Sequence, residues 1–292
     1  MATKRKPEWL TANVLGASKK AKITRLMKNN NLHTVCQSAR CPNRGECFEK
    51  GTAVFLILGD TCTRDCRFCA IPTAKDLPSP DKNEPVRVAR TAKNMGLNHV
   101  IITSVTRDDL EDGGAEIFVS TIDEIRKVMS AGTTIEVLTP DFKGNYKAVD
   151  KIVDKKPLIF NHNLETVESL YSHIRPQADY DLSMDLLKYV KKRGKTIFTK
   201  TGIMVGLGET KKQVKELLDD ARRACVDMLT IGQYLQADKR KVPVKEYIHP
   251  KTFNDYKSHA EKIGFRYVES APLVRSSYYS KNVTEILKDE LS

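Results

Sequence analysis

The sequence predicts an α/β fold in which a parallel sheet is covered by helices. Short apolar runs, each long enough for one buried strand, alternate with segments that carry the 3.6-residue periodicity of amphipathic helices. The predicted strands are residues 53–58, 99–103, 134–138, 158–161, 196–205 and 228–234, and the predicted helices are residues 86–95, 115–130, 145–154, 183–193 and 213–225. Six strands separated by helices fall short of the eight in a complete (β/α)8 barrel.

The first predicted strand indicates where the functional site should lie. Residues 53–58 form an uninterrupted apolar run, which suits a strand that is buried on both faces. The run leads into a loop that contains three cysteines. Because α/β barrels carry their chemistry at the C-terminal ends of their strands, we expect the site in this loop.

The last predicted helix has a recognisable beginning. Thr210 and Gln213 have the spacing of a capping box. The apolar residues that follow share one helical face: Val214, Leu217, Leu218, Ala221 and Cys225. This pattern predicts that Cys225 is a small buried apolar residue and not a metal ligand.

Composition and charge narrow the class of protein. The 292 residues include 49 basic and 37 acidic ones, which gives a net charge of +12. No apolar run approaches the ~18 residues of a membrane span. The first residues are charged without an apolar core behind them, so we expect no secretory signal and a cytoplasmic location. The positive charge favours an acidic partner, either nucleic acid or protein, or else indicates a solvated basic surface.

Three cysteines lie within eight residues after the first predicted strand. Cys62, Cys66 and Cys69 have the spacing C-x3-C-x2-C, and a loop this short can turn three thiolates toward one metal centre. Closed structural zinc sites take four protein ligands, whereas a centre with three ligands keeps one position open. On spacing alone, two interpretations remain: an iron–sulfur cluster with one free iron, or a zinc site with a distant fourth ligand.

The C-x3-C-x2-C spacing resembles the cluster motif of the radical S-adenosylmethionine superfamily. The resemblance implies a [4Fe-4S] cluster on Cys62, Cys66 and Cys69, whose fourth iron binds S-adenosylmethionine, with Phe68 near the adenine. It also implies the fold of that superfamily. We therefore expect a partial (β/α)6 TIM-type barrel, with N-terminal and C-terminal extensions that cover the cluster site.

A second triplet makes the resemblance more specific. Cys36, Cys41 and Cys47 precede the first, with the spacing C-x4-C-x5-C, and an R-S-S-Y motif stands near the end of the sequence. This combination resembles the lipoyl synthase family. The resemblance implies an auxiliary [4Fe-4S] cluster on the three cysteines, with Ser277 of the R-S-S-Y motif as its fourth ligand.

Polar residues that follow the predicted strands are candidates for contacts to S-adenosylmethionine. By their position relative to the motifs of the superfamily, the resemblance implies six contacts: Ser104 and Asp108 after the second strand, Asn163 and Glu165 after the fourth, and Gly206 and Glu209 after the fifth. Each group alone would be an ordinary turn between a strand and a helix. Their order along the sequence, one group per strand, is what favours a shared site.

The resemblance also implies an activity and its partners. The activity is sulfur insertion at C6 and C8 of a protein-bound octanoyl-lysine, with sulfur taken from the auxiliary cluster. The implied carriers are the E2 subunits of 2-oxoacid dehydrogenases and the glycine cleavage H protein, whose lipoyl domains are typically acidic. An electron donor such as ferredoxin or flavodoxin and an iron–sulfur carrier protein are also implied, without nucleic acid and without a membrane span.

The sequence alone is compatible with two other functions. A radical methylthiotransferase that acts on tRNA would suit the basic charge, and a non-catalytic zinc module would suit a basic surface that binds nucleic acid. Protein with two [4Fe-4S] clusters would be brown, whereas a zinc module would be colourless.

The domain prediction is an N-terminal extension over residues 1–50, a barrel over residues 51–270 and a C-terminal segment over residues 271–292.

Overall fold

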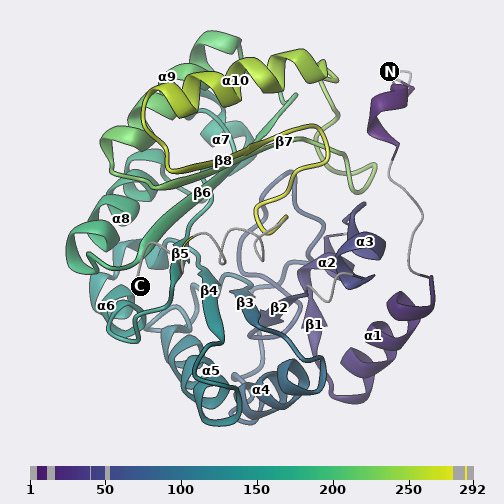
Figure 1. Ribbon diagram of the computed structural model, residues 1–292, viewed down its shortest axis with the longest axis vertical. Coiled ribbons are helices and arrows are strands. Elements are labelled where there is room, and N and C mark those ends of the chain that lie inside the picture. Colours follow the sequence, from purple (N-terminus) through teal and green to yellow (C-terminus); the bar gives the residue numbers. More distant parts are fainter. Residues whose placement is uncertain (1–4, 12–16, 40, 50–52, 279–286, 288–292) are drawn as a thin grey trace.

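A computed structural model provides the structure, which describes residues 5–11, 17–39, 41–49, 53–278 and 287 (Figure 1). The described residues form one eight-stranded sheet with the strands in chain order. The strands are β1 (His33–Thr34), β2 (Val54–Ile57), β3 (His99–Ser104), β4 (Thr134–Leu138), β5 (Ile159–Asn161), β6 (Phe198–Val205), β7 (Met228–Gln233) and β8 (Tyr267–Ser270). Strands β2 to β8 are parallel, and β1 pairs antiparallel with β2.

Helices cover the outside of this curved sheet, as Figure 1 shows. The α-helices are α1 (Ala17–Asn29), α2 (Val35–Ser38), α3 (Arg44–Glu49), α4 (Glu84–Asn94), α5 (Ala115–Val128), α6 (Tyr146–Val153), α7 (Tyr171–Ile174), α8 (Tyr180–Arg193), α9 (Lys211–Arg223) and α10 (Pro250–Lys262). Short 3-10 helices are η1 (Glu8–Leu10), η2 (Phe142–Gly144) and η3 (Glu168–Leu170). Among the described strands β8 does not pair with β1, so the sheet is an open, partial barrel.

The predicted fold class is therefore confirmed, and the structure adds one more unit. All six predicted strands and all five predicted helices are present, with ends that differ by at most three residues, at the start of α8. Helix α10 and strand β8 complete a sixth βα unit and add a seventh parallel strand. Two groups of buried apolar residues hold the helices on the sheet. Phe55 and Phe118 belong to the first, and Leu218 and Phe253 to the second.

Helix α9 begins as predicted but ends earlier. The Thr210 side chain accepts from the Gln213 backbone N–H, and the Gln213 side chain accepts from the Thr210 N–H, which completes the capping box. The helix ends at Arg223, and Cys225 has the left-handed φ of +63°. Because the chain has left the helix, the helical periodicity no longer applies, and Cys225 is exposed. The prediction of a buried Cys225 was wrong, while Val226 turns inward and is fully buried.

The segment that carries α2 and α3 contacts the segment that follows β8. The segment after β8 runs toward α2 and α3 in Figure 1. The Asn43 side chain donates to the Leu273 carbonyl at 2.6 Å, and the Tyr278 hydroxyl lies 3.2 Å from a carboxylate oxygen of Glu46. No helix in the described part of the chain is long and apolar enough to cross a membrane.

Candidate functional site

The loop after β2 brings three thiols to the C-terminal ends of the parallel strands. The loop is held by backbone hydrogen bonds from Cys62 N–H to the Pro72 carbonyl (2.9 Å) and from Cys69 N–H to the Cys66 carbonyl (3.0 Å). All three cysteines of the 62–69 triplet line one cavity of about 300 Å³. Residues at the ends of β3, β4, β5, β6 and β7 line the same cavity. We call it the barrel cavity.

The barrel cavity is lined by buried polar atoms that have no hydrogen-bond partner. Five of the eight such side-chain atoms among the described residues belong to its wall: Ser104 Oγ, Thr139 Oγ1, His162 Nε2, Asn163 Oδ1 and Arg175 Nε. A buried polar group without a partner costs about 1–3 kcal/mol. The wall therefore suits a polar ligand, such as an amino acid or a nucleoside, that supplies the missing partners.

Burial also shifts the pKa values of the titratable side chains that line this cavity. It raises the pKa of the Cys69 thiol to about 12, and it raises the pKa of the Cys66 thiol above its ordinary value. Burial lowers the pKa of His162 to about 4, so this imidazole is neutral near pH 7. Burial likewise raises the pKa of the Glu165 carboxyl. Cys66 and Cys69 keep their protons until a cation replaces them, as expected of thiols that become ligands when a metal binds.

A second cavity, of about 320 Å³, holds the other cysteine triplet. Its lining includes Cys36, Cys41, Cys47 and, from the far end of the chain, Ser277. Cys36 lies in α2 and Cys47 in α3. Burial raises the pKa of the Cys36 thiol to about 11. We call this space the auxiliary cavity, and the structure brings together in it all four residues that the sequence assigned to one cluster.

A close approach to β7 holds the R-S-S-Y segment in place. The Gln233 N–H donates to the Pro272 carbonyl at 3.1 Å. A Cβ at Gly232 would collide with the Val274 carbonyl oxygen, so glycine is needed where the segment crosses the strand. The Tyr278 N–H then closes a turn on the Arg275 carbonyl at 2.9 Å. This turn carries Ser277 to the auxiliary cavity.

The two cavities adjoin. Seven residues line both: Val35, Ala39, Phe68, Cys69, Met204, Arg275 and Ser276. Cys69 belongs to this common wall. Cys62 and Cys66 line the barrel cavity alone, and the other triplet lines the auxiliary cavity alone. No group of three or more His, Cys, Asp or Glu side chains in the described ranges is placed to hold a single metal ion. The fit of a larger cluster rests instead on the thiols that share each cavity.

Some predicted contacts lie outside both cavities. Asp108 accepts two hydrogen bonds from Arg64, at 2.6 and 2.9 Å, and does not line the barrel cavity. Glu209 accepts from the N–H groups of Gly206 (2.5 Å) and Leu207 (2.9 Å), which closes a tight turn after β6. Asp108, Gly206 and Glu209 as contacts to S-adenosylmethionine stay predictions. Ser104, Phe68, Asn163 and Glu165 do line the barrel cavity.

Sequence reasoning missed one prominent residue of the barrel cavity. Arg175 follows α7, is 8% exposed, and donates from Nη1 to the carbonyls of Asn163 (3.0 Å) and Leu164 (3.2 Å). The same atom donates to the Tyr171 hydroxyl at 3.0 Å. Arg175 belongs to no motif in the sequence, and its only sequence signal is a lone arginine before a proline.

Comparison with known proteins defines the class first. The family model of the Radical SAM superfamily matches residues 56–221, a span that contains the 62–69 triplet. The solved structures of Streptococcus suis SuiB (TM-score 0.59, 14% identity, 89% of this chain and 62% of that chain) and of methylornithine synthase (TM-score 0.54, 15% identity, 81% of each chain) share the fold. The chain is a radical S-adenosylmethionine enzyme, and this class implies a [4Fe-4S] cluster and S-adenosylmethionine.

The similar sequences define the family more narrowly. The chain is 50% identical to the lipoyl synthase of Caldicellulosiruptor saccharolyticus over 287 residues, which cover 98% of this chain and 100% of that protein. It is 52% identical to the lipoyl synthase of Caldanaerobacter subterraneus over 279 residues, 95% of this chain and 96% of that protein. The chain belongs to the lipoyl synthase family.

Proposed function

We propose that this chain forms the lipoyl group by inserting two sulfur atoms, at C6 and C8, into an octanoyl group carried on a lysine of a protein. The observation that supports this most is the pair of adjoining cavities, each lined by one cysteine triplet. Sulfur insertion needs a site that generates a radical and a source of sulfur within reach of the same carbon atom. Two cavities with a common wall meet that need.

The barrel cavity is the proposed site of radical formation. Cys62, Cys66 and Cys69 hold the [4Fe-4S] cluster, and the unpartnered polar atoms of the wall, among them Ser104 Oγ and Asn163 Oδ1, bind S-adenosylmethionine. The bound cluster and S-adenosylmethionine together supply a 5′-deoxyadenosyl radical, which can remove hydrogen from an unactivated carbon. The protein positions the reactants and excludes water.

The auxiliary cavity is the proposed source of sulfur. Cys36, Cys41, Cys47 and Ser277 hold a second [4Fe-4S] cluster, which supplies sulfide for the new carbon–sulfur bonds. A serine oxygen is a harder ligand than a thiolate and binds iron less well. Ser277 would therefore be the ligand of that cluster that is displaced most readily.

The proposal includes the substrates and the partners. The carriers are the octanoylated E2 subunits of 2-oxoacid dehydrogenases and the glycine cleavage H protein. An electron donor such as ferredoxin or flavodoxin and an iron–sulfur carrier protein are further proposed partners, and the proposed location is the cytoplasm. The division into residues 1–50, 51–270 and 271–292 assigns the auxiliary cysteines and the R-S-S-Y motif to the two extensions. Lys6, at the N-terminal end of the described chain, lines the auxiliary cavity.

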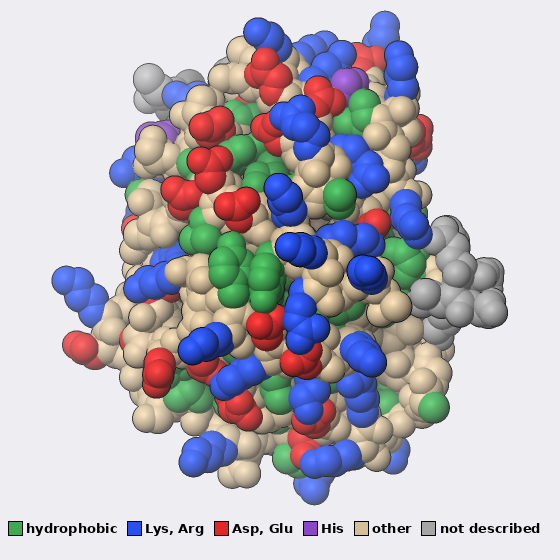
Figure 2. Space-filling view, turned by 90° about the vertical axis from the view of Figure 1, so that its left-hand side faces the viewer, with side chains coloured by type: hydrophobic (Ala, Val, Ile, Leu, Met, Phe, Trp, Pro, Cys, Tyr) green, Lys and Arg blue, Asp and Glu red, His purple; other side chains and the backbone are tan. Residues whose placement is uncertain are grey.

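The net charge of +12 would attract acidic carrier domains electrostatically. On the face in Figure 2, however, basic side chains are interspersed with acidic ones and do not form one patch. That face alone therefore does not define a docking surface. The basic residues of the N-terminal extension, some of which lie outside the described residues, are the proposed contribution to docking.

The experiment that tests this proposal separates the two triplets. Alanine at Cys62, Cys66 or Cys69 should abolish cleavage of S-adenosylmethionine and all sulfur insertion. Alanine at Cys36, Cys41 or Cys47 should leave cleavage intact but give no carbon–sulfur bond. The assay quantifies 5′-deoxyadenosine and the modified octanoyl-lysine peptide under anaerobic conditions. Sulfur insertion by a Cys36, Cys41 or Cys47 variant would refute the proposed sulfur source.

A further inference from the structure

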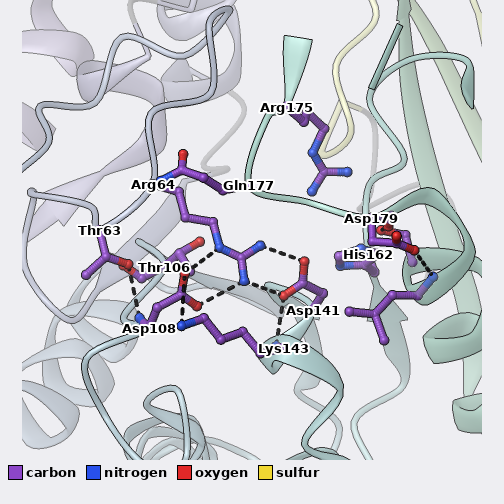
Figure 3. Close-up of polar contacts among 12 residues, drawn as sticks. Thr63, Arg64, Thr106, Asp108, Asp141, Lys143, His162, Arg175, Gln177 and Asp179 are labelled. Carbon is purple, nitrogen blue, oxygen red and sulfur yellow. Dashed lines mark hydrogen bonds and ion pairs between the residues drawn. The ribbon is translucent and has the colours of Figure 1, made fainter. Parts of the chain in front are cut away.

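Arg64, which stands between Cys62 and Cys66 in the sequence, is buried. Figure 3 shows its guanidinium held by the carboxylates of Asp108 and Asp141. Arg64 Nε and Nη2 donate to the two oxygens of Asp108 at 2.6 and 2.9 Å. Nη1 and Nη2 donate to the two oxygens of Asp141 at 2.6 and 2.7 Å. Asp108 lies in the loop after β3 and Asp141 in the loop after β4. One guanidinium therefore ties the 62–69 loop to the loops that follow the next two strands.

This contact is stronger than an ordinary surface ion pair. Arg64 is 5% exposed and Asp141 is 1% exposed, so water screens the interaction little. Bidentate pairs between arginine and carboxylate are among the strongest hydrogen bonds in proteins. Burial by itself would raise the pKa of Asp141, but the hydrogen bonds from Arg64 outweigh it and hold this pKa at about 2. Asp141 is therefore ionised across the physiological range.

We call the contacts of Arg64 with Asp108 and Asp141 the clamp. The clamp lies next to the groups that surround the Cys62 thiol. The backbone N–H of Arg64 points at Sγ of Cys62 at 3.4 Å, and the N–H of Thr106 points at the same sulfur at 3.3 Å. Thr63 joins the two segments, because its hydroxyl accepts from the Asp108 N–H and donates to the Thr106 carbonyl, each at 3.0 Å. Arg64 is thus both a member of the ion-pair network and a donor to the sulfur, and the second donor, Thr106, lies two residues before Asp108.

We infer that Arg64 is a positioning residue that, through Asp108 and Asp141, holds two N–H groups on Sγ of Cys62 and thereby raises the reduction potential of the cluster bound there. Hydrogen bonds to ligand sulfurs stabilise the reduced, more negative state of an iron–sulfur cluster. The inference rests on the proposed function only in assigning a cluster to the 62–69 triplet. The clamp itself belongs to the protein without the cluster.

The first test therefore uses the protein without iron. Arg64→Lys keeps the positive charge but loses the forked geometry, and Asp141→Asn weakens the clamp from a different loop. Both variants should exchange the amide hydrogens of the 62–69 loop about tenfold faster or more, with an unchanged circular dichroism spectrum. The matched control is Arg67→Lys in the same loop, whose exposed side chain contacts His173 at 2.9 Å. Unchanged exchange in both clamp variants would overturn the clamp.

The second test measures the potential. Its background carries alanine at Cys36, Cys41 and Cys47, so that the spectroscopic signal comes from the 62–69 triplet alone. Arg64→Lys should make the midpoint potential more negative at an equal iron content, and Arg67→Lys should leave it unchanged. A purely structural role would change iron content without this shift, and an equal potential in Arg64→Lys would overturn the inference. A background that binds no iron would refute the cluster assignment and the claim on potential together, while the exchange experiment would still decide the clamp.

Discussion

Replacing Glu136 by glutamine should destabilise the barrel strongly, although Glu136 lies outside both cavities. Glu136 in β4 is fully buried, and Lys200 in β6 is 1% exposed. Lys200 Nζ donates to Glu136 Oε1 at 2.9 Å, and the Asn161 side chain donates to the same oxygen at 3.2 Å. His99 Nε2 lies 3.4 Å from the other oxygen. The substitution removes a buried negative charge that faces a buried ammonium group.

The magnitude follows from two independent arguments. Burial by itself would raise the pKa of Glu136, but attraction to Lys200 and His99 outweighs it and lowers this pKa from 4.5 to about 2. At about 1.4 kcal/mol for each pH unit, this difference corresponds to roughly 3 kcal/mol of stability near neutral pH. Removing one partner of a buried ion pair costs about 3–5 kcal/mol in other proteins. We therefore expect a loss of about 3–5 kcal/mol, or roughly 5–8 °C in melting temperature for a chain of this size.

The pH dependence of the melting temperature tests whether the Glu136 charge is the source of this stability. Because the folded state lowers the pKa, the stabilising contribution is complete above about 4.5 and is lost as the pH falls toward about 2. The difference in melting temperature between the parent and Glu136→Gln should therefore narrow below about pH 4. The double variant Glu136→Gln, Lys200→Met should regain most of the loss, because no charge of the pair remains buried.

The matched control for this experiment is Glu216→Gln, at a carboxylate whose side chain is 56% exposed and lies 3.5 Å from Lys212. It should leave the melting temperature unchanged. Differential scanning calorimetry on the protein without iron, from about pH 3 to 8, measures all four proteins. A melting temperature for Glu136→Gln equal to that of the control would refute the reasoning. So would a difference that does not change with pH.

Three further predictions concern the auxiliary ligand, the docking of carriers and the exposure of Cys225. Ser277→Ala should give an unstable auxiliary cluster and no lipoyl product, whereas Ser276→Ala should be much milder; full activity and normal iron in Ser277→Ala would remove the ligand assignment. Salt should weaken binding of an octanoylated carrier domain, measured by calorimetry, but barely change binding of a short octanoyl-lysine peptide; equal sensitivity would argue against docking by charge. Cys225 is exposed, so a maleimide should label it first in the protein without iron; labelling of Cys36 ahead of it would contradict the structure.

The predictable part of the fold is the part with strong local signals. β2 was predicted because it lies in an uninterrupted apolar run, and the capped start of α9 was predicted because Thr210 and Gln213 have the spacing of a capping box. β8 gave no such signal, because Glu269 and Ser270 interrupt its short apolar pattern. Its place is set by pairing with β7, an interaction between distant residues that the local sequence does not encode.

The candidate site divides in the same way. The spacing of the 62–69 triplet predicted one shared cavity, because ligands in a short loop lie close together. Ser277 was grouped with the other triplet only through the resemblance to the lipoyl synthase family. The role of Arg64 was not predicted, because both of its carboxylate partners come from other loops. Asp108 shows that the orientation of a side chain is harder to predict than its place in the fold. Its place after a strand was read correctly, yet its oxygens face Arg64 and not the cavity, and no sequence pattern distinguishes the two orientations.

The open edge of the sheet explains why this sequence carries its second triplet before the first barrel strand and its serine after the last. In a closed barrel, β8 would pair with β2 and leave no place for a chain segment between them. Here β2 pairs with the short antiparallel β1, from which α2 follows directly, and the segment after β8 turns back toward α3. Two ends of the chain that are more than 200 residues apart therefore line one cavity. Because a closed sheet would leave no room for these segments beside β2, the auxiliary cavity depends on the incomplete barrel.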